Sequence, residues 1–492
     1  MKCFKSICLM LLVCLGNISV PAQTVTMSEA ISTARSRSVE ALEARHAFVS
    51  TYWAYRSYKA SRLPSFNFYG DLMNFDRSQV LIQSYEDGSF RYVNSYNLQN
   101  SLGLQVKQNV TFTGGTLTVY SDLSRIDQFG KDRSLTWYSQ PITISYRQPL
   151  FAYNQFKWDK LVEPKEYERG KKRYLESMEK ITVSAVTAYS NLITARMNHE
   201  VAISNFEDRQ KMLSVAAERM KLGSVTRDEY LQLELGMLND SISINETSVR
   251  VREAQMVLNS VLGFDESYEI VPVLNENLPD ILMDYDFVML KAMENSSFSL
   301  NNEINMLSAQ SNVAKAKADR GISMSLNARF GLSKNAPEFM GAYTDLIDQE
   351  VVGISFSVPI FDWGLGKGKV QKAKAAEEVV RAQVLQSEND FRRQIFTSVG
   401  QFNNQKQQCM VSRRAMLIAK ERYELVVDKF RSGNASVLDL NNARSENDSA
   451  RKKYVSDISS YWNYYYTLRQ YTLYDFIDRR DIDIDINEMI EK

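Results

Sequence analysis

The hydrophobic pattern of this chain alternates between two periods. From Ile181 onward, mostly apolar residues recur in alternating steps of four and three, which is the pattern of a coiled-coil seam. The many alanines in the seam predict close approach between helices. His199 and Arg209 interrupt it, and we interpret His199 as a tolerated seam residue. The seam continues through Ala185, Ala188, Leu192, Ala195, His199, Ala202, Phe206, Arg209, Leu213, Ala216 and Met220.

Other segments alternate residue by residue between apolar and polar side chains, which is typical of strands with one wet face. They predict strands at about 64–72, 98–112, 116–124, 141–149, 321–331 and 351–360. Thr113-Gly114-Gly115-Thr116 predicts a hairpin turn between the second and third of these strands. The polar stretches 73–99 and 124–139 are expected to be loops outside the sheet. The alternation fits a barrel wall around a wet lumen, and it also fits any half-buried sheet.

Two motifs recur at the same offset and indicate a tandem repeat. Residues 144–151 resemble residues 354–361, and residues 219–226 resemble residues 429–436, both at an offset of 210. The spacing from Pro149 to Gly223 equals that from Pro359 to Gly433, 74 residues in each copy. A weaker match, Ala60 with Ala318, has an offset of 258, so the first copy holds 48 additional residues.

The repeat sets the expected domain organisation. The first repeat spans 23–262 with a long helix at 150–222, and the second spans 285–475 with a long helix at 361–432. Segments 28–62, 226–262 and 286–320 are each expected to be one helix of about half that length. An irregular segment at 263–284 separates the repeats, and a C-terminal appendage covers 476–492. A single chain would expose the seams, so we expect assembly into a larger bundle. The 48 additional residues would give six strands per subunit, or eighteen in a trimer; the alternative is that they form a folded extracellular loop.

Composition and termini narrow the function classes. Lys+Arg and Asp+Glu balance at 59 each, so nucleic acid is not an expected partner. No segment approaches 18 consecutive apolar residues, so a membrane-embedded chain would have to form a closed barrel. Residues 1–22 resemble a signal peptide cleaved before Gln23, with lipidation of Cys14 as the alternative.

Few residues that commonly act in catalysis or metal binding remain after cleavage. After cleavage, Cys409 is the single cysteine, and the two histidines, His46 and His199, are far apart in sequence. A disulfide, a metal site and a cysteine–histidine nucleophile are therefore not expected. We predict no catalytic residue, no cofactor and no metal, and we expect that the protein is not an enzyme.

Two of these motifs carry a family resemblance. Residues 357–364, Ser-Val-Pro-Ile-Phe-Asp-Trp-Gly, look like the strand-to-helix signature of TolC-type outer-membrane efflux proteins, and residues 430–440 are similar to their helix-tip motif. The resemblance implies a mainly α fold with a transmembrane β-barrel. It further implies a homotrimeric α/β barrel-tunnel in the Gram-negative outer membrane that extends into the periplasm. The implied function is passive passage for a tripartite efflux or type I secretion system. The implied partners are a periplasmic adaptor (membrane fusion protein), an inner-membrane transporter of RND or ABC type, and outer-membrane lipid.

The same resemblance assigns roles to the helix tips. Adaptors of the family dock around the glycine turns, which makes Leu222, Gly223, Ser224, Ser432, Gly433 and Asn434 the docking candidates. The entrance or gate candidates are Asp228, Glu229, Phe430, Asp439 and Asn442. Two of them depart from the family pattern, because Phe430 replaces a latching tyrosine and Asn442 replaces an acidic residue.

Two other classes compete with the channel. A secreted coiled-coil scaffold or adhesin would explain the helices and the signal peptide, but not the Gly-Gly hairpin with alternating strands. An enzyme is the third alternative, although no carboxylates cluster in a strand-end or glycine-rich context. The lumen pattern does not choose between drugs, metal ions and polypeptides as cargo.

Overall fold

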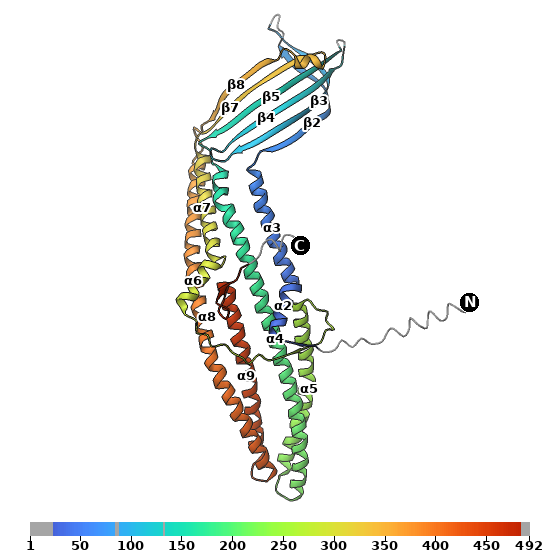
Figure 1. Cartoon of the computed structure of the whole chain (residues 1–492), viewed down its shortest axis with the longest axis vertical. Helices are drawn as coiled ribbons and strands as arrows, with labels where there is room; N and C mark the ends of the chain where they lie inside the picture. The colour runs from blue at the N-terminus through green and yellow to red at the C-terminus, as the bar shows by residue number, and fades with distance from the viewer. Residues whose placement is uncertain (1–22, 84–87, 131–132, 484–492) are drawn as a thin grey trace, which may run out of the picture. The chain divides into compact units, whose positions relative to one another are not determined.

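The computed structural model describes residues 23–83, 88–130 and 133–483 (Figure 1). The expected signal peptide and the last nine residues of the expected appendage lie outside this part of the chain. The chain divides into a sheet unit, residues 50–170 and 300–387, and a helical unit that holds the other described residues. Among the described residues, no helix is both long and apolar enough for a membrane span.

The sheet unit is built on one antiparallel sheet of six strands, in the order β2-β3-β4-β5-β7-β8. Its strands are β2 (Ser65–Gln83), β3 (Phe90–Val110), β4 (Gly115–Gln128), β5 (Ser134–Leu150), β7 (Ser323–Ala336) and β8 (Ile347–Ser357). Each neighbouring pair in this order is visible in Figure 1. β2 and β8 form the two edges of the sheet, which is open in the single chain.

Most of the first repeat's strands extend beyond their predicted bounds. Residues 74–83 of β2 pair with residues 90–99 of β3, so a stretch expected to be a loop is a long hairpin. β-Branched and aromatic pairs such as Val80 with Val93 and Leu81 with Tyr92 favour this extension. The stretch 124–139 is likewise mostly strand, because β4 continues to Gln128 and β5 begins at Ser134.

The Gly-Gly turn joins β3 to β4 next to the helices. Gly114 has φ +80°, a left-handed conformation that favours glycine, and its N–H donates to the Val110 carbonyl at 2.8 Å. Two side chains from other parts of the sheet unit hold the turn in place. The Gln148 amide donates to the Thr113 carbonyl at 2.9 Å, and the Asn154 amide donates to the Thr111 carbonyl at 3.2 Å. The additional hairpin is therefore part of the sheet and of its junction with the helices.

The long helices have matching lengths in the two repeats. α4 (Gln155–Lys221) and α8 (Leu365–Arg431) each contain 67 residues. α5 (Arg227–Leu262) and α9 (Val437–Thr472) each contain 36 residues, close to half as many. The predicted fold class, mainly α with strands for a β-barrel, is confirmed in its long helices and its sheet, and the sheet is open in the single chain.

The segments expected to be single helices at 28–62 and 286–320 are each broken. The first is α2 (Met27–Arg37) and α3 (Val39–Ser61), and the second is α6 (Tyr285–Asn295) and α7 (Phe298–Arg320). Ser38 and Ser296 lie at the breaks with ψ of 150° and 164°, outside the helical region. Their hydroxyls accept from the backbone N–H of Ala41 and of Phe298, so each serine competes with the continuing helix.

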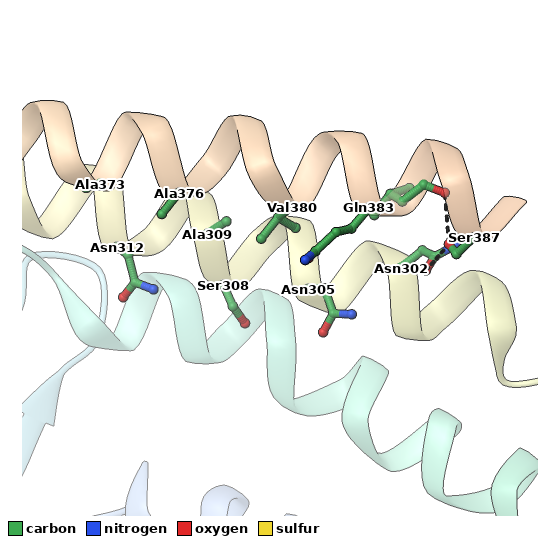
Figure 2. Close-up of a pocket in the computed structure, with 11 residues that line it drawn as sticks. Asn302, Asn305, Ser308, Ala309, Asn312, Ala373, Ala376, Val380, Gln383 and Ser387 are labelled. Atoms are coloured by element: carbon green, nitrogen blue, oxygen red, sulfur yellow. Dashed lines mark hydrogen bonds between the residues drawn. The ribbon is translucent and has the colours of Figure 1, made fainter.

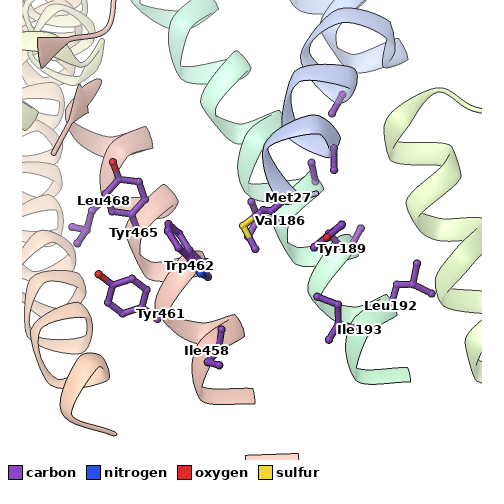
Figure 3. Packing of buried hydrophobic residues seen from close by; sticks show 14 of the residues in the cluster. Met27, Val186, Tyr189, Leu192, Ile193, Ile458, Tyr461, Trp462, Tyr465 and Leu468 are labelled. Atoms are coloured by element: carbon purple, nitrogen blue, oxygen red, sulfur yellow. The ribbon is translucent and has the colours of Figure 1, made fainter. Parts of the chain in front are cut away.

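The core of the helical unit is rich in aromatic residues. Figure 3 shows Tyr461, Trp462 and Tyr465 on α9, and it shows Val186 of α4 near Met27 of α2. The Tyr461 hydroxyl donates to the Pro279 carbonyl at 2.8 Å. These aromatics thus hold the non-helical segment between the repeats as well as the helices.

Two small sheets complete the helical unit. β1 (Gln23–Val25) pairs in parallel with β6 (Ile270–Pro272), inside the segment expected to be irregular. The Tyr189 hydroxyl, which is fully buried, donates to the Val25 carbonyl at 2.7 Å. Near the C-terminus, β9 (Tyr474–Asp475) pairs with β10 (Arg480–Asp481). The start of the first repeat is therefore tied to the segment that precedes the second.

Candidate functional site: two helix tips and a two-faced sheet

The first tip (residues 222–226) is a glycine turn between α4 and α5. Gly223 has φ +74°, and the N–H of Ser224 donates to the Arg219 carbonyl at 3.0 Å, which closes the end of α4. Thr226 caps α5 in a reciprocal pair with Glu229, whose N–H donates to the Thr226 hydroxyl at 3.2 Å. Leu222 is 81% exposed, so the tip presents an apolar side chain to its surroundings.

The second tip (residues 432–436) repeats this geometry between α8 and α9. Gly433 has φ +86°, and the N–H of Asn434 donates to the Lys429 carbonyl at 2.8 Å. Ser436 and Asp439 form the same reciprocal cap as Thr226 and Glu229. Hydrogen bonds from the Ser436 hydroxyl and N–H lower the pKa of the Asp439 carboxyl. The six docking candidates therefore lie on two turns of one design.

The two tips share one apolar core. It combines residues of the first repeat with residues of the second: Met212, Ala216, Val225, Leu233, Phe430, Val437 and Leu440. Arg219 joins the tips by polar contacts as well, since its Nη1 donates to the Phe430 carbonyl at 2.8 Å and its Nη2 to the Ser224 carbonyl at 3.3 Å. The structure therefore brings the two groups of docking candidates together.

The gate candidates divide into exposed and buried residues. Asp228, Asp439 and Asn442 are exposed, while Glu229 is half-buried and engaged in its cap. Phe430 is 1% exposed and packs inside the shared tip core, with the Arg219 guanidinium 5.2 Å from its ring centroid. A role for the Phe430 side chain at an open entrance does not fit this placement, because apolar contacts surround its ring.

A buried polar cluster lies beside the shared tip core, where the seam is interrupted. Arg209 of α4 donates to the Asp240 carboxylate at 2.6 Å and to the Asn441 side-chain oxygen at 3.3 Å. Arg444 also reaches Asp240, at 3.4 Å. A Cβ at Gly236 would collide with the Arg209 guanidinium, so the glycine makes room for this cluster. The cluster connects α4 and α5 of the first repeat to α9 of the second.

From β2 to β7 the register places mostly apolar side chains on one face of the sheet and mostly polar ones on the other, whereas Asp348 and Glu350 of β8 lie on the apolar face. Paired residues share a face, and the row Phe66, Val106, Val119, Ile144 and Phe330 runs apolar across five strands. Other members of this face are strongly exposed in the single chain, for example Phe68, Val352, Ile354 and Phe356. The opposite face carries rows such as Asn67, Gln105, Tyr120, Thr143 and Gly331.

This division of faces suits a membrane wall. An apolar band of this extent is unusual on a water-exposed surface, whereas a barrel needs one face for lipid and one for a wet lumen.

A groove between α7 and α8 in the sheet unit has a volume of about 490 Å³. Figure 2 shows that amide, hydroxyl and small apolar side chains line it, among them Asn302, Asn305, Ser308 and Gln383. No lining residue is charged or a histidine, so the groove offers no general acid or base. The groove therefore offers hydrogen-bonding groups beside small apolar side chains.

Residues 293–472 match the family described as outer membrane efflux protein. The match covers the second repeat from α6 to the end of α9. It confirms the family resemblance over these residues. No protein of curated function matches the sequence significantly.

Solved outer-membrane proteins share the fold along nearly the whole chain. The chain is similar to the CmeC channel of Campylobacter jejuni, with a TM-score of 0.66, 14% identity, and coverage of 97% of this chain and 94% of that one. VceC of Vibrio cholerae gives a TM-score of 0.62 at 14% identity, with 91% and 95% covered. The MtrE channel of Neisseria gonorrhoeae gives 0.59 at 14% identity, with 93% and 91% covered.

Sequence reasoning missed the residues that join the repeats. Arg219 lies inside the recurring tip motif, yet nothing in its spacing indicates a contact with Phe430, 211 positions later. The polar cluster had one usable signal, since a charged Arg209 interrupts an apolar seam and therefore requires a buried partner. Its partners Asp240 and Asn441 come from other helices and carry no local signal of their own.

Proposed function

We propose that this protein is the outer-membrane channel subunit of a tripartite efflux or type I secretion system and that it conducts passively as a homotrimer. The observation that carries the proposal is the two-faced sheet, with an apolar band on one face and polar rows on the other.

Closure of the wall requires other copies of this chain. A sheet cannot present edges to lipid, because the backbone N–H and C=O groups there would lack partners. β2 leaves α3 and β8 leads into α8, so β2 of one copy and β8 of the next would run antiparallel. Three sheets of six strands then make a wall of 18 strands. This count is supported by β3 and β4, which hydrogen-bond on both sides inside the sheet and so are not a folded outer loop.

The helix tips are the proposed docking site for a periplasmic adaptor, which in turn would contact an inner-membrane transporter. Support comes from the two glycine turns of one geometry and from the exposed Leu222. A groove of about 810 Å³ beside the shared tip core adds to this surface, with lining residues that include Asp208, Tyr423 and Arg431. Its lining combines charged residues with the apolar Met212, Met416 and Val427.

Strand pairing between copies can be tested by disulfide trapping. Phe68→Cys in β2 is combined in turn with Val352→Cys, Ile354→Cys or Phe356→Cys in β8, all on the apolar face. We expect disulfide-linked dimers and trimers for at least one pair, and monomers for each single cysteine variant. Cys409 gives little background, because burial raises the pKa of its thiol to about 11. Monomers for every pair would contradict the closed wall.

Adaptor docking is tested by crosslinking in cells, followed by purification of the protein and identification of the captured adaptor and transporter. Gly433→Leu forces a bulky residue into a left-handed turn and should reduce capture and export, with the trimer and membrane insertion intact. Gly433→Asn is the matched control, since asparagine tolerates this conformation. Equal capture by both variants would refute the docking assignment. Recovery of the protein in the soluble periplasmic fraction would instead favour the scaffold or adhesin alternative.

A further inference from the structure

Three cationic side chains gather on the polar face of the sheet, close to the strand ends that meet the helices. The register aligns Lys107, Thr118, Ser145 and Arg329 in one row across β3, β4, β5 and β7. Arg147 lies two residues beyond Ser145 on β5 and is therefore a diagonal neighbour of Arg329 on the same face. Lys107, Arg147 and Arg329 are all exposed, and we call them the cationic belt.

On the polar face, the two rows that hold the cationic belt and the row next to them contain no carboxylate. The neighbouring row contains Asn67, Gln105, Tyr120, Thr143, Gly331 and Gln349, and the Arg147 row contains Thr116, Asn327 and Gly353. Among the ion pairs of the described residues, none involves a belt residue. The nearest carboxylate along this face is Asp122, two rows away, and it accepts a hydrogen bond from the Tyr69 hydroxyl at 2.6 Å.

Arg125, on the opposite face of the sheet, differs from the belt residues in its contacts. Arg125 is a cation of the same sheet, but it lies on the apolar face, where it pairs with Asp127 at 2.9 Å and stacks on Trp137. Within the described part of the chain, the belt residues form no ion pair or ring contact of this kind, and they alternate with apolar neighbours such as Val106, Tyr146 and Phe330. Their side chains therefore belong to the face that would border a wet lumen.

We propose that the cationic belt attracts anionic groups inside the channel, so that this level favours cargo bearing carboxylate, phosphate or sulfate groups. The inference rests on the proposed channel function and deepens it by naming a cargo class. Unneutralised cations that line a pore raise the local concentration of anions, and rings of Arg or Lys are a common device of anion-conducting pores. Since every copy contributes three cations, a closed trimer repeats the belt around the whole lumen.

The test uses the purified full-length channel in planar bilayers. Reversal potentials are measured under a roughly tenfold KCl gradient, and tripolyphosphate is added as a polyanionic probe. The variant Lys107→Gln/Arg147→Gln/Arg329→Gln should shift the reversal potential toward cations and weaken tripolyphosphate block about tenfold. Arg125→Gln is the matched control and should leave both quantities unchanged. Asp122→Asn should shift the reversal potential in the opposite direction.

Several outcomes would contradict the proposed role of the cationic belt. An unchanged reversal potential and unchanged block in the triple variant would do so, as would an equal shift in Arg125→Gln. Bilayers with and without anionic lipid separate the two sources of phosphate, and a belt effect found only with anionic lipid would assign the belt to headgroups instead of cargo. If the triple variant does not assemble, Arg147→Gln and Arg329→Gln are measured singly, and no shift in either would refute the proposal. Absence of any channel from the wild-type protein would refute the channel function itself.

Discussion

Arg219 of the first repeat and Phe430 of the second are joined twice, by a hydrogen bond and by a ring contact. The Nη1 of Arg219 donates to the Phe430 carbonyl at 2.8 Å, and its guanidinium lies 5.2 Å from the centroid of the buried phenyl ring. The same guanidinium reaches the Ser224 carbonyl, so one side chain fixes both tips. Movement of one tip relative to the other would have to break these contacts.

Replacement of this side chain should loosen both tips. Arg219→Met keeps the apolar stem but removes two hydrogen bonds from a cation, each worth about 1.5–3 kcal/mol. We expect faster amide hydrogen exchange at residues 223–226 and 432–436 and a higher leak conductance in bilayers. Arg219→Lys is the matched control. Its exchange rates and leak conductance should lie between those of wild type and Arg219→Met, because lysine keeps the charge without the planar guanidinium. Exchange rates equal to wild type would show that the apolar core alone holds the tips.

The long helices and the repeat could be predicted because their signals are local and periodic. The seam predicted that α4 is helical, and the shared offset of 210 extended the same prediction to α8. The breaks at Ser38 and Ser296 were missed, because one serine barely disturbs an otherwise regular helical pattern. These serines are themselves related by the offset of 258, so the weaker repeat contained the missing signal.

Contacts between the repeats could not be predicted in the same way. Arg219 and Phe430, or Arg209 and Asn441, meet because long helices pack together, and neither residue of a pair constrains the other's position in sequence. The strand extensions were underestimated for a different reason. Polar residues on a wet strand face resemble loop residues when the alternation is weak, as it is between Asn94 and Gln99.

The pH dependence of the second tip should show whether the Asp439 carboxylate only caps α9 or also acts at the channel entrance. The Ser436 hydrogen bonds lower the pKa of Asp439 in the folded protein, so the cap stabilises α9 above the pKa of an unfolded aspartate. That contribution is lost as the pH falls through the lowered pKa. Ser436→Ala should raise the pKa of Asp439 and move the loss of α9 structure to higher pH, as measured by hydrogen exchange against pH.

Comparison with Asp439→Asn completes that test. If the exposed carboxylate acts only as a cap, Ser436→Ala and Asp439→Asn should change leak conductance equally at neutral pH. A larger effect of Asp439→Asn on conductance or on block by divalent cations would assign the charge to the entrance.

A buried ion-pair cluster in the helical unit should be far more costly to disrupt than a surface pair. Glu179, which is fully buried, pairs with Arg35 at 2.6 Å and with Arg469 at 3.0 Å. Glu179→Gln leaves two arginines without their shared carboxylate and should cost about 3–5 kcal/mol. Glu200→Gln is the matched control, because Glu200 and Arg451 join α4 to α9, two of the three helices of the cluster, on the surface, where such a pair contributes about 0–1 kcal/mol. Thermal unfolding in detergent measures both, and similar melting temperatures for the two variants would contradict the importance of the buried cluster.

Gly103 should be required for the polar face of the wall. It lies between Tyr69 and Asp122 in one row, and the absence of a side chain lets the Tyr69 hydroxyl cross β3 and donate to Asp122 at 2.6 Å. A Cβ at Gly103 would lie 2.5 Å from the Tyr69 ring, so Gly103→Val must displace the tyrosine, at a cost of about 1–3 kcal/mol. We expect the trimer of this variant to dissociate in SDS at a lower temperature than wild type. Equal dissociation temperatures for Gly103→Val and wild type would show that the Tyr69–Asp122 contact does not stabilise the wall.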